Sequence, residues 1–189
     1  METLINLDQE LFLFLNGLGT SSWDGFWMFM TNKWSSIPLY VFLLILCFIK
    51  LKWKKTLLIL VLVALMVTVS DQLSNVFKYG LERLRPCHDG LIESQMRLVK
   101  SYCGGKFGYF SAHASNSFVV VTFFSLIFRR IFNWLPFLLI IWGMTVAYSR
   151  IYIGVHYPLD VITGITFGML IGLVFYTLYQ WITKRFSLV

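Results

Sequence analysis

Charged side chains are scarce in this sequence of 189 residues. Only 13% are Asp, Glu, Lys or Arg, whereas 58% are hydrophobic and the mean hydropathy is +0.72. A soluble globular domain averages about 25% charged and about 45–50% apolar residues. So few charges cannot cover a water-facing surface of this size, which argues against a soluble enzyme, a disordered chain or a nucleic-acid-binding module. The composition predicts an integral membrane protein.

Acidic residues are the scarcer of the two charged kinds, with nine against sixteen basic residues and a net charge of +7. No basic helix or basic–aromatic strand accompanies this excess, so no nucleic-acid partner is expected. The basic residues instead gather at 50–55, 129–130 and 184–185, each at the end of an apolar segment. Because Lys and Arg concentrate in cytoplasmic loops, these junctions predict the cytoplasmic side of the membrane. The loops 79–113 and 149–157 then lie on the outer side.

Five segments meet or approach the length of about 20 apolar residues that a membrane-spanning helix needs. They are residues 34–49, 56–77, 114–128, 131–148 and 158–183. This pattern predicts an all-α membrane bundle of about five transmembrane helices, with residues 1–189 forming a single domain and residues 34–189 its transmembrane core. Residues 1–33 contain two shorter apolar pieces that we interpret as helices lying on the outer interface. A re-entrant hairpin stays open as the alternative for these residues.

Ionisable residues gather at one level of this predicted bundle. Such residues are costly in or against a bilayer and are therefore functional candidates. By the topology above, seven of them lie at the outer face, namely Asp71, Lys78, Arg85, His113, Arg150, His156 and Asp160. Segments far apart in the sequence thus direct polar groups to one place.

Three of these residues are cations suited to a phosphate group. Arg85 and Arg150 carry guanidinium groups that match phosphate oxygens bidentately, and Lys78 adds a third charge. Ser111 directly precedes an apolar helix as a candidate N-cap, and a helix N-terminus binds anions through its backbone N–H groups.

The two histidines supply the reactive groups. His156 and Asp160 are four residues apart, so near a helix start the carboxylate can hold one ring nitrogen and leave the other free to attack. His113 can protonate a leaving oxygen. Cations, a nucleophile and an acid together predict a phosphoryl-transfer site.

The same residues fall into three motifs that resemble the signature of the type 2 phosphatidic acid phosphatase superfamily, which includes vanadium-dependent haloperoxidases and glucose-6-phosphatase. The motifs are residues 78–86, 110–113 and 149–160. The first and third match the family pattern in spacing. The second has Phe110 and Ala112 where the family usually has Pro and Gly, although it keeps the Ser and the His.

The resemblance implies a role for each residue of the site. His156 would form a phosphohistidine, Asp160 would orient it, and His113 would be the general acid. The phosphate would be held by Lys78, Arg85, Ser111 and Arg150. No metal or other cofactor is implied, and the sequence itself offers no credible metal site.

The remaining polar residues of the second predicted span and of the outer loop are expected to have structural rather than catalytic roles. Asp71, Ser74 and Asn75 share a helix face with Lys78 and are expected to position it. The remaining loop residues are expected to be solvated, namely Arg83, His88, Arg97, Lys100 and Lys106. Cys87 and Cys103 lie in the same outer loop, where a disulfide and two free thiols are both open.

We therefore expect a membrane lipid phosphatase acting on a phosphomonoester or pyrophosphate at the outer face, in a bacterial inner membrane. Phosphatidate, phosphatidylglycerophosphate, a polyprenyl diphosphate and a lipid A phosphate all fit. The expected partners are this lipid phosphate and the surrounding membrane lipids, with the oligomeric state open. The alternatives are a lipid phosphotransferase using the same phosphohistidine and, more weakly, a transporter or channel, whose charges would be spread through the bilayer.

Overall fold

The computed structural model describes residues 2–187, and within them nearly all regular structure is helical, with no strand. The α-helices are α1 (Glu2–Gly17), α2 (Ser21–Thr31), α3 (Ile37–Leu81), α4 (Ala112–Phe128), α5 (Leu135–Tyr152) and α6 (Pro158–Arg185). Short 3-10 helices are η1 (Lys33–Ser36), η2 (Pro86–His88) and η3 (Glu93–Gln95). The predicted all-α class is confirmed.

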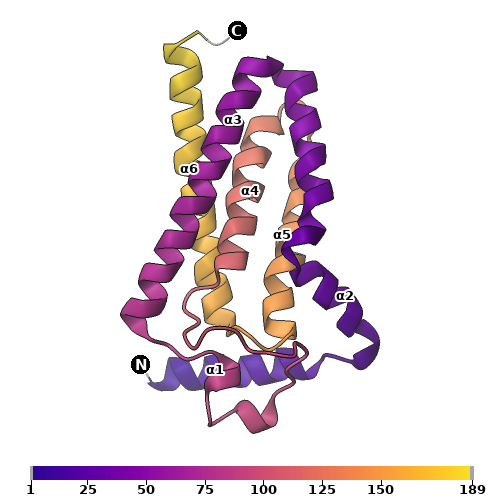
Figure 1. Ribbon diagram of the computed structural model, residues 1–189, viewed down its shortest axis with the longest axis vertical. Helices are drawn as coiled ribbons and strands as arrows, with labels where there is room; N and C mark the ends of the chain where they lie inside the picture. The colour runs from indigo at the N-terminus through magenta and orange to yellow at the C-terminus, as the bar shows by residue number, and fades with distance from the viewer. Residues whose placement is uncertain (1, 188–189) are drawn as a thin grey trace.

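Helix α3 consists of two antiparallel arms. Lys52 has a φ of 62° and a ψ of 161°, which no helix accommodates, and the chain reverses there (Figure 1). Residues 37–51 form the first arm and residues 53–81 the second. The reversal falls in the basic cluster predicted to separate two spans, and the arms diverge toward the other end of the bundle (Figure 1).

Three elements are long and apolar enough to cross a membrane: Lys33–Leu81, which contains both arms of α3, then α5 and α6. Helix α4 has 17 residues, or about 26 Å, and is slightly shorter than a bilayer core of about 30 Å. With the arms of α3 counted separately, the apolar helices correspond to the five predicted segments. Helix α5 begins four residues later than expected, because residues 131–134 form turns before Pro136 in its first turn.

Small residues bring α4 and α6 close together. Gly164, Gly168 and Gly172 recur every four residues along one face of α6. A Cβ added at Gly164 would lie 2.6 Å from the Ser111 carbonyl oxygen, and one at Gly168 would collide with the Ser115 carbonyl oxygen. Helix backbones in membranes approach this closely where such small residues line the contact. The glycines therefore fix the position of α4 against α6.

Helix α1 lies across the end of the bundle away from the α3 reversal (Figure 1). It buries Asp8, Phe12 and Asn16 against the protein. The Asn16 side chain donates to the Tyr152 carbonyl oxygen (2.9 Å) and accepts from the Arg97 N–H (2.7 Å). These buried hydrogen bonds join α1 to the end of α5 and to the outer loop.

The outer surface of α1 is apolar. Leu4, Leu7 and Phe14 are more than half exposed. Such a face suits a helix lying on the membrane interface, which remains our prediction for residues 1–33.

The loop between α3 and α4 is held by two cross-links. Leu84 and Phe107 form an isolated antiparallel bridge. Cys87 and Cys103 are bonded in a disulfide, with their Cα atoms 5.9 Å apart. Of the two states that the sequence left open for these cysteines, the structure has the disulfide.

Candidate active site

Four helix ends lie toward the end of the bundle that α1 crosses: the C-terminal ends of α3 and α5 and the N-terminal ends of α4 and α6 (Figure 1). The residues predicted for the site lie on these ends or in the adjoining loops, and we call them the outer cluster. They are Lys78, Arg85, Ser111, His113, Arg150, His156 and Asp160. The basic junctions at 50–55, 129–130 and 184–185 lie toward the opposite end.

His156 and Asp160 form a buried pair. His156 lies in the turn before α6, and its Nδ1 is 3.4 Å from Asp160 Oδ2. The same carboxylate oxygen accepts the Tyr157 backbone N–H at 3.0 Å, because Asp160 occupies the third position of α6 and turns back to its N-cap. With Nδ1 facing the carboxylate, Nε2 is the ring nitrogen available for chemistry.

The environment keeps His156 uncharged. Its side chain is only 3% exposed, and this burial lowers its pKa well below the ordinary value. Arg85, Arg150 and Lys78 lower the pKa further, because they repel a proton on the ring. The imidazole is therefore neutral at neutral pH, which is the form that can act as a nucleophile.

The two arginines are held by protein oxygens. Arg85 Nε donates to the Phe107 carbonyl oxygen (3.3 Å), which orients the guanidinium. Arg150 is 5% exposed, and its Nη1 donates to the Thr31 hydroxyl of α2. Arg150 Nε is buried and has no hydrogen-bond partner among residues 2–187. Arg150 thus presents an unused donor of the kind that a phosphate oxygen accepts.

Ser111 and His113 lie at the start of α4. Ser111 is its N-cap, with Oγ accepting the Ala114 N–H at 3.5 Å and its own N–H donating to the Asp160 carbonyl oxygen at 2.9 Å. His113, in the first turn, is exposed and lies within electrostatic reach of Arg150 and His156. The two motifs at 110–113 and 149–160 are therefore joined directly.

Phe110, which departs from the family pattern, has a packing role. It is fully buried and stacks on Phe167 of α6, with ring centroids 4.9 Å apart. Its carbonyl oxygen accepts the Ser74 hydroxyl of α3 at 3.0 Å. The larger side chain thus anchors the start of α4 between its neighbours.

Two residues of the predicted α3 network contact α4 or the loop just before it. Besides Ser74, Asp71 accepts the Asn116 side chain at 2.9 Å and lies within electrostatic reach of Lys78. Asn75 is exposed. Positioning of Lys78 by this network remains a prediction.

The prediction that Arg83 is a solvated loop charge is wrong. Arg83 Nη1 donates to Asp160 Oδ1 at 2.9 Å, and Nη2 donates to Asp8 Oδ2 at 2.5 Å. Asp8 is 3% exposed and also accepts the Leu159 N–H at 2.9 Å. A bridge thus runs from α1 through Arg83 to the carboxylate beside His156. The sequence gives one indication of this bridge: Asp8 is an acidic residue in a largely apolar segment and therefore needs a partner if it is buried.

Arg97 is expected to be solvated, and its side chain is 34% exposed, but it also forms an ion pair. Its Nη2 pairs with Asp24 of α2 at 3.0 Å, and its guanidinium lies over the ring of Tyr152. The pair joins the outer loop to α2. Lys106 is exposed, as expected of a solvated charge.

A polar cavity of about 300 Å³ lies beside His113, between α2, α3 and α4. Its polar lining comprises Thr31, Asn32, Lys33, Ser36, Tyr40, Asp71, His113, Asn116 and Ser117. This cavity gives the general-acid candidate room for a substrate group on one side.

Comparisons with known proteins agree on the family. The model of the PAP2 superfamily matches residues 56–184. The chain is 35% identical to a lipid A 4'-phosphatase of Bacteroides thetaiotaomicron, covering 98% of this chain and 82% of that protein. It is 36% identical to a lipid A 4'-phosphatase of Porphyromonas gingivalis, covering 98% and 78%.

A solved structure has the same fold. The crystal structure of a PAP2-type phosphatidylglycerolphosphate phosphatase from Bacillus subtilis aligns with a TM-score of 0.72 at 19% identity, covering 98% of this chain and 88% of that one.

Proposed function

Because the chain belongs to the PAP2 superfamily and is a phosphate-ester hydrolase of the membrane, we propose that it removes the 4'-phosphate of lipid A through a phosphohistidine at His156. The relatives that support this substrate match nearly the whole chain rather than the motifs alone. The observation that carries the mechanism is the buried pair of His156 and Asp160 among three cations.

In the first step, the Nε2 lone pair of His156 attacks phosphorus. The bond between phosphorus and the lipid oxygen breaks, and its electrons remain on that oxygen. His113 donates the proton that converts the oxygen into the departing alcohol. Lys78, Arg85 and Arg150 stabilise the equatorial oxygens, while Asp160 stabilises the positive charge that develops on the imidazole.

In the second step, water attacks the phosphohistidine. His113, now neutral, accepts the proton from the water, so the residue that was the acid becomes the base. The P–N bond breaks, its electrons return to Nε2, and inorganic phosphate leaves. The N-terminus of α4, which Ser111 caps, stabilises the bound phosphate through its backbone N–H groups.

We place the site at the outer face of a bacterial inner membrane. The outer cluster lies at the end of the bundle opposite the basic junctions 50–55, 129–130 and 184–185, which the positive-inside rule assigns to the cytoplasm. Labelling of Lys106, which is exposed in the outer loop, by a membrane-impermeant amine reagent tests this orientation.

The decisive experiment measures phosphate release by purified protein in detergent from lipid A, phosphatidate, phosphatidylglycerophosphate and a polyprenyl diphosphate. We expect the highest kcat/KM for lipid A, with the 4'-phosphate removed. A phosphohistidine should be trapped by rapid acid-free quenching and located at His156 by mass spectrometry.

His156→Ala should abolish phosphate release while leaving the Tm of the protein near the wild-type value. His88→Ala is the matched control, because His88 is exposed and lies outside the outer cluster. Release that persists in His156→Ala would refute the proposed nucleophile. A higher kcat/KM for another lipid of the panel would refute the proposed substrate.

A further inference from the structure

Asp71 is a carboxylate without an ion pair beside the outer cluster. It lies on the second arm of α3, is partly buried, and lines the polar cavity next to His113. The ion pairs within residues 2–187 are formed by other acidic residues, and Asp71 takes part in none of them. Its Oδ1 accepts the Asn116 side chain at 2.9 Å. A carboxylate has about four lone-pair directions, so Asp71 can accept further hydrogen bonds from a ligand.

Asp71 places a negative charge near the position of the phosphate. It lies within electrostatic reach of Lys78, one of the three cations proposed to hold the phosphate oxygens. This charge repels a phosphate, and an ionisable group at the edge of a bilayer is costly in itself. Attraction to Lys78 offsets part of the cost. The remaining lone pairs of the carboxylate are used only if a donor group of the substrate reaches them.

The polar cavity lies on the side of the outer cluster from which the leaving group departs. His113, the proposed general acid, lines the cavity, and so does Thr31, whose hydroxyl accepts the Arg150 guanidinium. In an in-line displacement, the nucleophile and the leaving oxygen lie on opposite sides of phosphorus. The leaving oxygen must also lie within reach of the acid that protonates it. The part of the alcohol next to that oxygen therefore occupies the cavity.

The lining of the cavity suits a neutral group that both donates and accepts hydrogen bonds. It contains one acidic side chain, Asp71, and one lysine, Lys33 of η1, together with the hydroxyls of Thr31 and Ser36. A charged ligand is repelled by Asp71 or by Lys33, whereas a ring with several hydroxyl groups pairs with both. The volume of about 300 Å³ is at the lower end of the range of about 300–1,000 Å³ for small-molecule sites, which fits one sugar ring.

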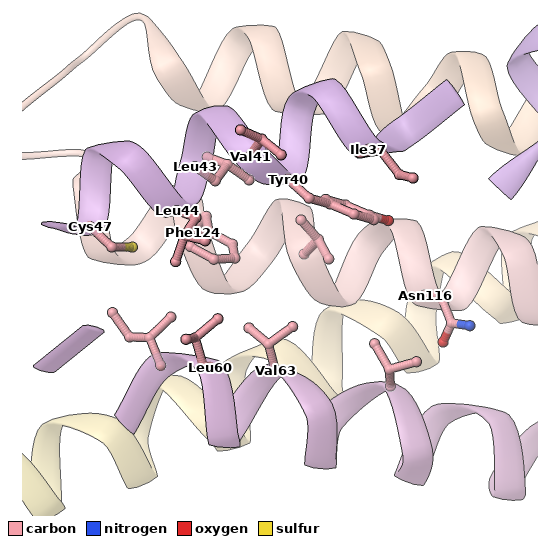
Figure 2. Close-up of a pocket in the computed structure, with 13 residues that line it drawn as sticks. Ile37, Tyr40, Val41, Leu43, Leu44, Cys47, Leu60, Val63, Asn116 and Phe124 are labelled. Atoms are coloured by element: carbon pink, nitrogen blue, oxygen red, sulfur yellow. The ribbon is translucent and has the colours of Figure 1, made fainter. Parts of the chain in front are cut away.

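The polar lining ends at Asn116. Asn116 and Tyr40 also line a second, apolar pocket between the arms of α3 and α4, and Figure 2 shows Asn116 at one end of that pocket. Polar groups therefore surround only the atoms nearest His113. Because its amide donates to Asp71, Asn116 also holds the carboxylate in place at this boundary.

We propose that Asp71 accepts a hydrogen bond from a hydroxyl or amide N–H group of the sugar that carries the phosphate, and so selects a sugar phosphate over other lipid phosphates. This role of Asp71 rests on the proposed function, because it requires lipid A at the outer cluster. It is a direct contact with the leaving alcohol and is distinct from the positioning of Lys78.

The other lipids differ from lipid A in the groups that they present to Asp71. The diacylglycerol part of phosphatidate has ester oxygens but no O–H or N–H donor, so the carboxylate stays unsatisfied. The leaving group of a polyprenyl diphosphate is itself a phosphate and is repelled. A sugar supplies donors and carries no charge at this position. Asp71 thus contributes to specificity both by accepting from the sugar and by disfavouring the alternatives.

The test uses Asp71→Ala, which removes the acceptor, and Asp71→Asn, which keeps an acceptor of the same shape but removes the charge. Gln72→Ala is the matched control, because Gln72 is the adjacent polar residue of the same arm, is exposed and does not line the cavity. For each protein, kcat/KM is measured for lipid A, phosphatidate and a polyprenyl diphosphate. The rise in Tm on adding inorganic phosphate reports the phosphate site without turnover.

Asp71→Ala should lower kcat/KM for lipid A relative to that for phosphatidate by about 10- to 100-fold, the range expected for the loss of one hydrogen bond to a charged group. Asp71→Asn should lower this ratio less, and it should raise kcat/KM for the polyprenyl diphosphate relative to that for lipid A. Gln72→Ala should leave both ratios at the wild-type values.

Equal losses for all three lipids would overturn the proposal, and a smaller phosphate-induced rise in Tm would then show that Asp71 acts through Lys78. Unchanged ratios in both Asp71 variants would overturn it as well. If Asp71→Ala does not fold, the ratios of Asp71→Asn decide alone. Wild-type protein that releases no phosphate from lipid A would instead refute the proposed function.

Discussion

Replacing Arg83 by Gln removes the guanidinium that contacts both Asp8 and Asp160. Both carboxylates are at most 3% exposed, and the Arg83 side chain itself is 21% exposed. Breaking a buried ion pair by removing one partner costs about 3–5 kcal/mol, because the other charge is left without compensation. We therefore expect the free energy of unfolding of Arg83→Gln to fall by about that amount.

The same substitution should slow the reaction. Arg83 holds Oδ1 of the carboxylate whose Oδ2 faces His156. A hydrogen bond between charged groups contributes about 1.5–3 kcal/mol, so its loss at the step that charges the imidazole corresponds to a decrease in kcat of about 10- to 100-fold. KM should change little, since Arg83 acts through Asp160 rather than on the substrate.

The assay is steady-state phosphate release from lipid A by Arg83→Gln, Asp160→Asn and the double variant. If Arg83 positions Asp160, the two losses in kcat will not add, because the second substitution removes a contact that the first has already made ineffective. Arg83→Lys, which keeps the charge, should recover part of the stability. A wild-type kcat in Arg83→Gln, a change confined to KM, or additive losses would each refute this reasoning.

Three further outcomes follow from the structure. Because the pKa of His156 is depressed by burial and by nearby cations, the acidic limb of kcat/KM should lie below pH 6.5, where protonation removes the nucleophile. Gly168→Leu should destabilise the protein by several kcal/mol through collision with α4, whereas Gly25→Leu, in open space, should leave Tm unchanged. Replacing Cys87 and Cys103 by Ser should lower the free energy of unfolding by about 3 kcal/mol, the loop-closure contribution for their separation of 16 residues.

The spans and the outer cluster could be predicted because both depend on local patterns. A run of apolar residues ended by Lys or Arg is visible in the sequence wherever it occurs, and it locates one end of a helix. Once the spans are drawn, residues such as Lys78, Arg150 and His156 fall at the same depth whatever the lateral packing. The chemistry of the cluster could therefore be inferred without knowing which helix lies beside which.

The lateral contacts could not be predicted in this way. Arg83 and Asp8 are 75 residues apart, and no periodicity relates a residue of an extended loop to a residue of an interfacial helix. Arg97 and Asp24 are separated by 73 residues and present the same problem. The outer loop contains several basic residues. The sequence does not show which of these residues forms an ion pair with a carboxylate in the folded protein.

The segment before residue 56 belongs to the site, although the family model matches only residues 56–184. Thr31 of α2 accepts the Arg150 guanidinium, and Lys33 of η1 lines the cavity beside His113. Asp8 of α1 holds Arg83 and the first turn of α6. The matched region contains the proposed nucleophile, the proposed acid and the three cations of the outer cluster. Helices α1 and α2 contribute Asp8 and Thr31, the partners that orient Arg83 and Arg150. The geometry of the proposed site therefore depends on how the N-terminal helices pack against the bundle.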